Sequence, residues 1–200
     1  MNNTLQNLIN KNYLDKETIK QASIAFTSNN IIYNIQLQSF LKENIFKSLE
    51  KEMKLLSYSY KYKPDIHSYF SADVPESFIS LLESEEFKQL IQEITKTKLT
   101  NVTAEACYFK NKNYTILNDK ETIKDGISFF FDLSSWDNKF GGYTVFVNKD
   151  KNLIQQPIQN SLTLALQSKH QRNFIKYVNN QAKDNKRFII KGYFKEKLNK

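Results

Sequence analysis

The sequence predicts an α+β fold in which helices come first and the strands of a sheet follow. Before residue 98, apolar residues recur at helical spacings, whereas from Thr103 onward β-branched and aromatic runs alternate with turn residues. This segregation is typical of helices packed on one side of a sheet. The three consecutive phenylalanines at 129–131 predict a strand covered on both faces, since they could not otherwise all leave water.

The length and cysteine content predict a single domain, residues 1–200, in a reducing compartment. A chain of 200 residues with 40% hydrophobic residues can bury a core without staples. Cys107 is the only cysteine, which excludes an intramolecular disulfide. The sequence shows neither a signal peptide nor an apolar run of membrane-spanning length. We therefore expect a cytoplasmic (intracellular) protein with no membrane partner.

The formal net charge of +8 comes almost entirely from lysine, because only two of the 29 basic residues are arginines. The composition is rich in Lys, Asn and Ile and poor in Gly and Pro, as in proteins encoded by AT-rich genomes. A solvated lysine surface is therefore the favoured interpretation. An acidic partner is the alternative.

Four segments are expected to be helical because apolar residues recur in them at helical spacing: 1–28, 40–56, 75–82 and 84–97. Asp15 and Ser84 are suited to cap two of these helices, because their side chains accept hydrogen bonds from backbone N–H groups. Residues 1–30 form a helical extension in this interpretation, and residues 31–37 alternate as a strand.

Residues 57–70 interleave tyrosines with lysines and have no sustained period. An ordered loop packed by its own tyrosines is the favoured interpretation. A lid over a substrate groove, carried by Tyr58, Tyr60 and Tyr62, comes next. A nucleic-acid surface is the third, since interleaved aromatic and cationic residues are typical of such surfaces.

Seven strands are expected after residue 102: 103–110, 114–118, 126–133, 142–148, 161–167, 173–178 and 187–194. Trp136, Gly141 and Gly142 lie in the connection between the third and fourth strands, and such a turn-rich connection is the usual signal of a hairpin. Cys107 lies inside an apolar strand and is expected in the core.

Four short motifs resemble those of the 2-oxoglutarate/Fe(II) oxygenases, and especially of the prolyl hydroxylases that modify ribosomal proteins. They are ISFFFDLSSW followed by GG at 141–142, SEEFKQLIQEITKTKL at 84–99, NSLTL at 160–164, and RFIIKGYF at 187–194. Lys96 stands where the family usually has glycine. The resemblance covers residues 31–194 and implies a double-stranded β-helix, or jelly roll (cupin-like), supported by the N-terminal helices.

The resemblance also implies where the metal ligands should lie, and none of those positions carries a ligand. Two histidines and one carboxylate hold the iron in this family. The family's His-x-Asp motif falls on Asn118 and Lys120, and its distal histidine falls on Asn173. Amides are poor ligands for Fe(II), and a protonated lysine has no lone pair to offer. Lys120 either replaces part of the metal's charge or points to solvent.

Arg187 is the one site position at which the family pattern survives. The resemblance implies that it matches the arginine that binds the far carboxylate of 2-oxoglutarate in the family. A guanidinium suits a bidentate contact with a carboxylate. A structural ion pair with a neighbouring Asp or Glu is the alternative for Arg187. Lys120, Tyr108 and Tyr114 are further candidates for binding an anion or 2-oxoglutarate.

Another metal site would have to use the two histidines, His67 and His170, together with Asp119, and it is not favoured. Phosphate-binding loops, Cys/His ligand spacings and nucleophile elbows are absent from the sequence.

The favoured function is that of a degenerate, non-catalytic, prolyl-hydroxylase-like protein without a cofactor. It would bind a protein, a peptide or a small dicarboxylate or phosphate in the former active-site cleft. The first alternative is an active 2-oxoglutarate-dependent dioxygenase with Fe(II) and an unusual metal site. The second is a lysine-rich RNA-associated module, which is not favoured.

Overall fold

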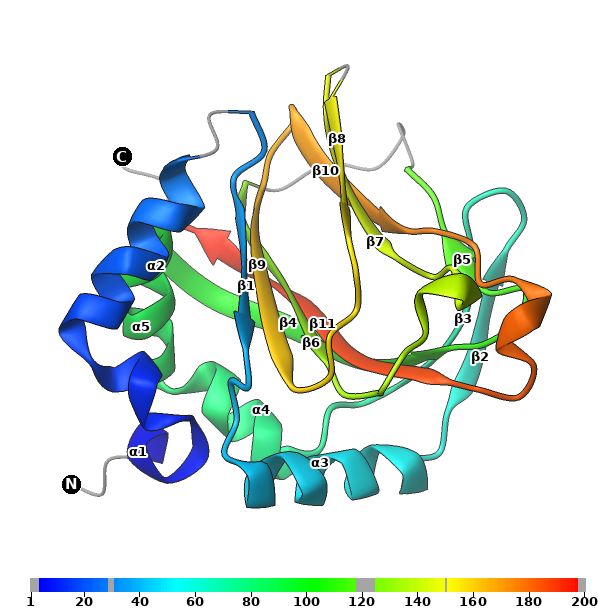
Figure 1. Cartoon of the computed structure of the whole chain (residues 1–200), viewed down its shortest axis with the longest axis horizontal. Helices are drawn as coiled ribbons and strands as arrows, with labels where there is room; N and C mark the ends of the chain where they lie inside the picture. The colour runs from blue at the N-terminus through cyan, green and yellow to red at the C-terminus, as the bar shows by residue number, and fades with distance from the viewer. Residues whose placement is uncertain (1–3, 29–30, 118–124, 150, 198–200) are drawn as a thin grey trace.

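A computed structural model describes residues 4–28, 31–117, 125–149 and 151–197 of the chain. In this part of the chain, helices flank one large, curled antiparallel sheet, and a smaller three-stranded sheet lies on its other side (Figure 1). None of the described helices is long and apolar enough to span a bilayer. The predicted α+β class and the double-stranded β-helix are therefore confirmed.

The helices are α1 (Thr4–Leu8), α2 (Lys16–Ser28), α3 (Glu43–Leu55), α4 (Glu76–Glu83) and α5 (Glu85–Thr95), with short 3₁₀ helices at Lys11–Leu14, Asn138–Phe140 and Asn180–Ala182. Both predicted caps are confirmed. The carboxylate of Asp15 accepts from the Thr18 N–H at 2.9 Å, and the hydroxyl of Ser84 accepts from the Phe87 N–H at 3.2 Å. The four predicted helical segments correspond to these elements.

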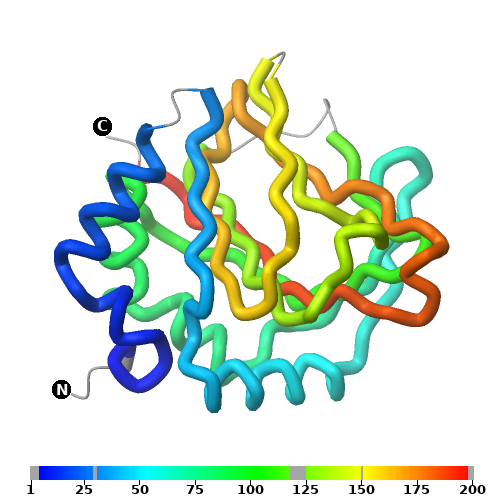
Figure 2. The backbone as a smooth tube through the Cα atoms, in the orientation of Figure 1, coloured from blue at the N-terminus to red at the C-terminus, as the bar shows by residue number. Residues whose placement is uncertain are grey.

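The strands are β1 (Asn34–Gln38), β2 (Ser59–Lys63), β3 (His67–Ala72), β4 (Leu99–Phe109), β5 (Tyr114–Thr115), β6 (Gly126–Asp132), β7 (Thr144–Asn148), β8 (Lys151–Gln155), β9 (Ser161–Gln167), β10 (Gln171–Ile175) and β11 (Arg187–Glu196). The large sheet has the order β1-β9-β6-β11-β4-β3-β2, and β5 pairs with β3. The small sheet has the order β10-β7-β8. The tube view shows the chain leaving the large sheet for β7 and β8, returning as β9, and leaving again as β10 (Figure 2).

Two hydrophobic cores follow from the alternation of side chains along the strands. Phe129 and Phe131 belong to a cluster between the large sheet and the helices. Phe130 belongs to a second cluster, with Phe146 of the small sheet, that fills the space between the two sheets. The prediction that this strand is covered on both faces is confirmed, since every residue of β6 is buried. Cys107, as predicted, is fully buried in the second cluster.

The predicted hairpin of the third and fourth strands is wrong. β6 pairs with β9 and β11, whereas β7 pairs with β8 and β10 in the other sheet. The turn-rich connection crosses from one sheet to the other. It is held by Trp136, whose indole N–H donates to the Gly141 carbonyl at 2.8 Å. Glycines at 141 and 142 are needed there because both have positive φ, at 72° and 68°.

Residues 57–70 are not a loop. They contain β2 and most of β3, which pair as an antiparallel hairpin at the edge of the large sheet. The period was hard to recognise because β2 is exposed on both faces, so its residues do not alternate between apolar and polar. β8 was missed for the same reason, since it too is mostly exposed.

Candidate functional site

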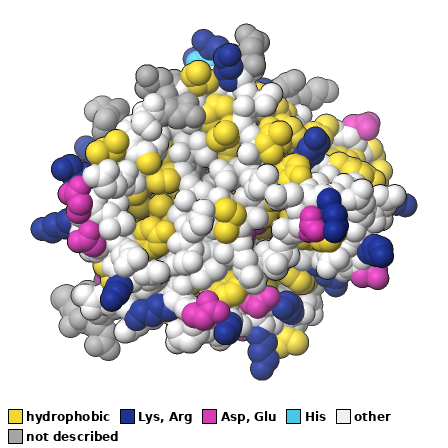
Figure 3. Space-filling model, in the orientation of Figure 1, with side chains coloured by type: hydrophobic (Ala, Val, Ile, Leu, Met, Phe, Trp, Pro, Cys, Tyr) yellow, Lys and Arg dark blue, Asp and Glu magenta, His cyan; other side chains and the backbone are white. Residues whose placement is uncertain are grey.

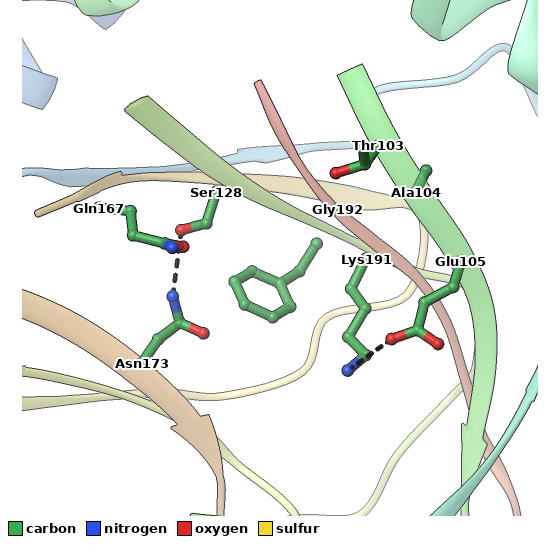
Figure 4. A pocket seen from close by; sticks show the side chains of 9 residues that line it. Thr103, Ala104, Glu105, Ser128, Gln167, Asn173, Lys191 and Gly192 are labelled. Atoms are coloured by element: carbon green, nitrogen blue, oxygen red, sulfur yellow. Dashed lines mark hydrogen bonds and ion pairs between the residues drawn. The ribbon is translucent and has the colours of Figure 1, made fainter. Parts of the chain in front are cut away.

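A pocket of about 340 Å³ opens between the two sheets, beside the second hydrophobic cluster. Side chains on the inner faces of β4, β6, β9, β10 and β11 converge on it (Figure 4). Its lining residues are Thr103, Ala104, Glu105, Ser128, Phe130, Gln167, Asn173, Lys191 and Gly192. The pocket therefore combines one cation, one carboxylate, two amides and hydroxyl groups on an aromatic wall.

Asn173 is the one predicted ligand position that the structure places in this pocket. β10 brings it opposite β6, where its amide Nδ2 donates to the Ser128 hydroxyl at 3.1 Å (Figure 4). The Ser128 hydroxyl in turn donates to the Ala165 carbonyl at 3.2 Å. This chain of hydrogen bonds fixes the amide of Asn173 against the wall of the pocket.

Lys191 and Glu105 form the charged part of the pocket, and neither was predicted from the sequence. The Lys191 ammonium lies 3.0 Å from the Glu105 carboxylate, and their side chains are only 19% and 36% exposed. Tyr69 closes the group, because its hydroxyl donates to Glu105 at 3.1 Å and its ring centre lies 4.3 Å from the Lys191 nitrogen.

This network sets the protonation states of its members. Burial lowers the pKa of Lys191, but Cys107, Glu105 and Tyr69 outweigh it, so the net shift of the pKa is upward. Burial raises the pKa of Tyr69 to about 12, and it also raises the pKa of the Cys107 thiol. Lys191 is therefore a fixed cation, and neither it nor Cys107 is a nucleophile at neutral pH.

Arg187 lies outside the pocket. It is fully buried at the start of β11, where its Nε donates to the Asp132 carboxylate at 2.7 Å. Its two terminal nitrogens donate to the Gly142 carbonyl and to the Thr144 hydroxyl. The structural ion pair, which was the alternative for Arg187, is thus the interaction that the structure contains.

The two tyrosines predicted as pocket hydroxyls do not line the pocket either. Tyr108 points to the other face of the large sheet, where its ring stacks on Phe70 at 4.5 Å. Tyr114 stacks on Tyr177 at 6.3 Å. The alternation of β4 explains the first result, because Glu105 and Cys107 face the pocket side and Tyr108 therefore faces away.

The predicted lid residues also lie elsewhere. Tyr58 packs on Tyr108 at 4.8 Å, and its hydroxyl donates to the Met53 carbonyl of α3. Tyr60 and Tyr62 stand on the exposed hairpin and are 53% and 59% exposed. None of the three lines the pocket between the sheets.

Residues 58–200 match the model of the family described as oxoglutarate and iron-dependent oxygenase degradation C-term. The chain belongs to this family. No curated protein sequence matches the chain significantly.

Solved structures of oxygenases share the fold. A prolyl-4-hydroxylase from Pseudomonas putida is 12% identical, with a TM-score of 0.68 over 88% of this chain and 100% of that one. A prolyl hydroxylase from Trichoplax adhaerens, in complex with a hypoxia inducible factor peptide fragment, is 13% identical, with a TM-score of 0.70 over 92% and 96%. A 2OG-Fe(II) oxygenase family oxidoreductase from Burkholderia pseudomallei is 10% identical, with a TM-score of 0.67 over 90% and 92%. At such low identity these likenesses show the oxygenase fold alone.

The described residues of the pocket do not fit the iron site of this oxygenase family. The amide at position 173 is already bonded to Ser128, and the ammonium of Lys191 would repel a divalent cation. Within the described ranges, no three His, Cys, Asp or Glu side chains are grouped as a metal site. Asn118, Asp119 and Lys120 lie outside the described residues.

The two histidines are not part of the pocket. His170 lies in the exposed turn between β9 and β10, whereas His67 begins β3 and packs on Tyr69 at 5.4 Å. Figure 1 shows that turn well apart from the β2–β3 hairpin.

The sequence of this oxygenase family member does contain a signal for Lys191. If Arg187 faces the interior between the sheets, the period of two places Ile189 and Lys191 on the same face. A lysine on the inner face of a central strand needs a buried anion. β4, the strand that pairs with β11, contains one acidic residue, Glu105, which lies two residues before Cys107. Glu105 was therefore the candidate anion for Lys191.

Proposed function

We propose that this chain is a non-catalytic protein of the oxygenase fold whose pocket binds a carboxylate-bearing ligand in place of iron and 2-oxoglutarate. The observation that carries the proposal is the pairing of Lys191 with Glu105 in the pocket. Asn173, which the sequence predicts at the position of the family's distal histidine, lines the same pocket. In this proposal the ammonium of Lys191 takes the place of the iron ion as the positive charge that holds the ligand, and it supplies no redox chemistry.

Lys191 suits this role because an ammonium group has three N–H donors, and the ion pair with Glu105 needs only one of them. The amide groups of Gln167 and Asn173 line the side of the pocket away from Lys191 (Figure 4), where they would meet a second polar group of the ligand. An apolar stem of the ligand would pack on Phe130. The pocket therefore offers a charged end and an apolar wall to one ligand.

The carboxylate could belong to a small dicarboxylate or to a peptide. The Trichoplax prolyl hydroxylase was solved with a peptide fragment, which supports a peptide ligand for a protein of the same fold. One charged contact gives weak binding, so we expect dissociation constants in the millimolar range for a free dicarboxylate.

Thermal unfolding in the presence of succinate tests the binding. A ligand at ten times its dissociation constant stabilises a fold by about 1.4 kcal/mol. We expect Lys191→Met to abolish the succinate-dependent rise in Tm, and Lys195→Met, an exposed lysine on the same strand, to leave it unchanged. The neutral diamide of succinate should produce no shift. An acidic peptide that competes with succinate would identify the peptide source.

Metal analysis of protein purified without chelators tests the non-catalytic part. We expect no stoichiometric iron and no turnover of 2-oxoglutarate. About one iron per chain together with turnover would refute the proposal and support the active hydroxylase instead.

A further inference from the structure

A row of aromatic rings crosses the edge of the large sheet, on the face away from the pocket. It consists of Tyr62, Tyr60, Phe70 and Tyr108, and we call it the aromatic row. Tyr62 and Tyr60 stack at 5.9 Å with 11° between their planes, Tyr60 packs on Phe70 at 4.9 Å, and Phe70 stacks on Tyr108 at 4.5 Å. Burial increases along the row, from 59% exposed at Tyr62 to 8% at Tyr108. One end of the row therefore offers flat, solvent-exposed rings.

The exposed end is held in place by a buried polar network. The Tyr60 hydroxyl shares a 3.0 Å hydrogen bond with the Ser68 hydroxyl, which also accepts from the Asn113 amide at 3.0 Å. Ser68 and Asn113 are 4% and 3% exposed. A half-exposed tyrosine with such support loses little side-chain entropy when a ligand stacks on it.

The charge around the aromatic row is positive. The Lys110 nitrogen lies 5.0 Å from the Phe70 ring centre, and the Lys186 nitrogen lies 4.7 Å from that of Tyr108. Lys61 and Lys63 alternate with the tyrosines on the exposed strand β2, so they point to its opposite face. The three segments that build the row, 57–63, 67–72 and 108–113, contain four lysines and no acidic residue. On the face of the molecule drawn in Figure 3, lysine and arginine side chains are mixed with acidic ones.

We propose that the aromatic row binds single-stranded nucleic acid. Bases would stack on Tyr62 and Tyr60, and Lys110 and Lys186, which lie over the rings of the row, would contact the phosphates. Stacking on aromatic rings and a positively charged path for the backbone are the two elements of sequence-tolerant single-strand binding. β2 is the outermost strand of the sheet, so a strand of nucleic acid can approach the rings from the open side. Binding here is independent of the pocket between the sheets.

Fluorescence anisotropy with a short labelled oligouridylate, titrated with the full chain at low and at physiological salt, tests the proposal. We expect Tyr62→Leu to weaken binding about tenfold or more, and Tyr62→Phe to retain it, because stacking needs the ring and not the hydroxyl. Tyr177→Leu is the matched control, since Tyr177 is 48% exposed but lies outside the row. Replacing both Lys110 and Lys186 with alanine should flatten the salt dependence, by about 0.7 in log–log slope for each phosphate that a lysine no longer neutralises. Replacing Lys61 and Lys63, on the opposite face of β2, is the control and should have a smaller effect.

Circular dichroism of each variant separates loss of binding from loss of fold. Deoxyribonucleotides of the same length show whether the 2′-hydroxyl contributes. The absence of binding at low salt would overturn the proposal, as would equal binding by Tyr62→Leu and the wild type. Equal affinity for poly-glutamate would also overturn it, because it would identify a general polyanion or acidic-peptide surface.

Discussion

The Nε of Arg187 lies 2.7 Å from a carboxylate oxygen of Asp132, and both side chains are almost completely buried. This pair joins the first residue of β11 to the last residue of β6. Arg187→Met would leave the Asp132 carboxylate buried without a partner. We expect it to lower the free energy of unfolding by about 3–5 kcal/mol in urea titrations.

The double variant Arg187→Met/Asp132→Asn should recover part of that stability, since no uncompensated charge remains. Arg187→Lys should recover little, because one ammonium cannot reproduce the hydrogen bonds to Asp132, Gly142 and Thr144. A cost below about 1 kcal/mol for Arg187→Met would show that the pair is not structural. In Arg187→Lys the succinate-dependent stabilisation should persist, because Arg187 does not line the pocket.

Lys96→Gly should stabilise the fold by about 1 kcal/mol, measured by urea or thermal unfolding. Lys96 ends α5 in the left-handed conformation, with φ 58° and ψ 18°, which glycine adopts without strain. This geometry also explains why the resembling oxygenases have glycine there. Lys98→Gly is the control and should not stabilise, because φ at Lys98 is not positive. An equal gain from both variants would mean that loss of a lysine charge, rather than backbone strain, is responsible.

The stability of the protein should fall as the pH rises from about 10 to about 12. Burial raises the pKa of Tyr69 from 10.0 to about 12, so in this window the unfolded state has lost the phenolic proton and the folded state retains it. Stability that is complete below pH 10 is therefore lost through this window. One such group contributes no more than about 1.4 kcal/mol per pH unit, and less here because the ring is partly exposed.

Tyr69→Phe should flatten this alkaline slope while lowering stability at pH 8, because the variant cannot donate a hydrogen bond to Glu105. Tyr62→Phe removes an exposed hydroxyl and should leave the slope unchanged. An unaltered slope in Tyr69→Phe would assign the alkaline loss of stability to other groups, such as Lys191.

Restoring the three family ligands by Asn118→His, Lys120→Asp and Asn173→His should create measurable Fe(II) affinity if these positions are aligned correctly. Asn173 already lines the pocket on β10. Adding Lys191→Met should increase the affinity further, since the cation would be removed. Calorimetry or fluorescence quenching by Fe(II) or Co(II) provides the measurement. A folded triple variant with no gain over Asn173→His alone would show that positions 118 and 120 were wrongly assigned.

Elements with a clear apolar pattern could be predicted from the sequence. α5 was found because Phe87, Leu90, Ile91 and Ile94 form one stripe, and β6 because its phenylalanines needed cover on both sides. β2 and β8 were not predicted, because strands exposed on both faces need no alternation of apolar and polar residues. Which strand pairs with which is a long-range property, so the local turn signal after β6 predicted the wrong neighbour.

The candidate site was predicted only where a family motif marked it. Asn173 follows from NSLTL by counting, and the structure places it in the pocket. The partner of Arg187 could not be read from a motif, because Asp132 lies on another strand and their pairing depends on sheet order. The ion pair of Lys191 with Glu105 could not be predicted without knowing that β4 and β11 are neighbours in the sheet.

β11 comes after every other described strand in the chain, yet it lies between β4 and β6 in the middle of the large sheet. During synthesis, β4 and β6 are therefore made before β11, the strand that pairs with both of them. Until β11 is present, their apolar faces remain exposed to water. Pairing residues so distant in sequence makes folding slow, on the order of milliseconds to seconds. The nascent chain is thus exposed to aggregation until β11 has been synthesised and has paired with both neighbours.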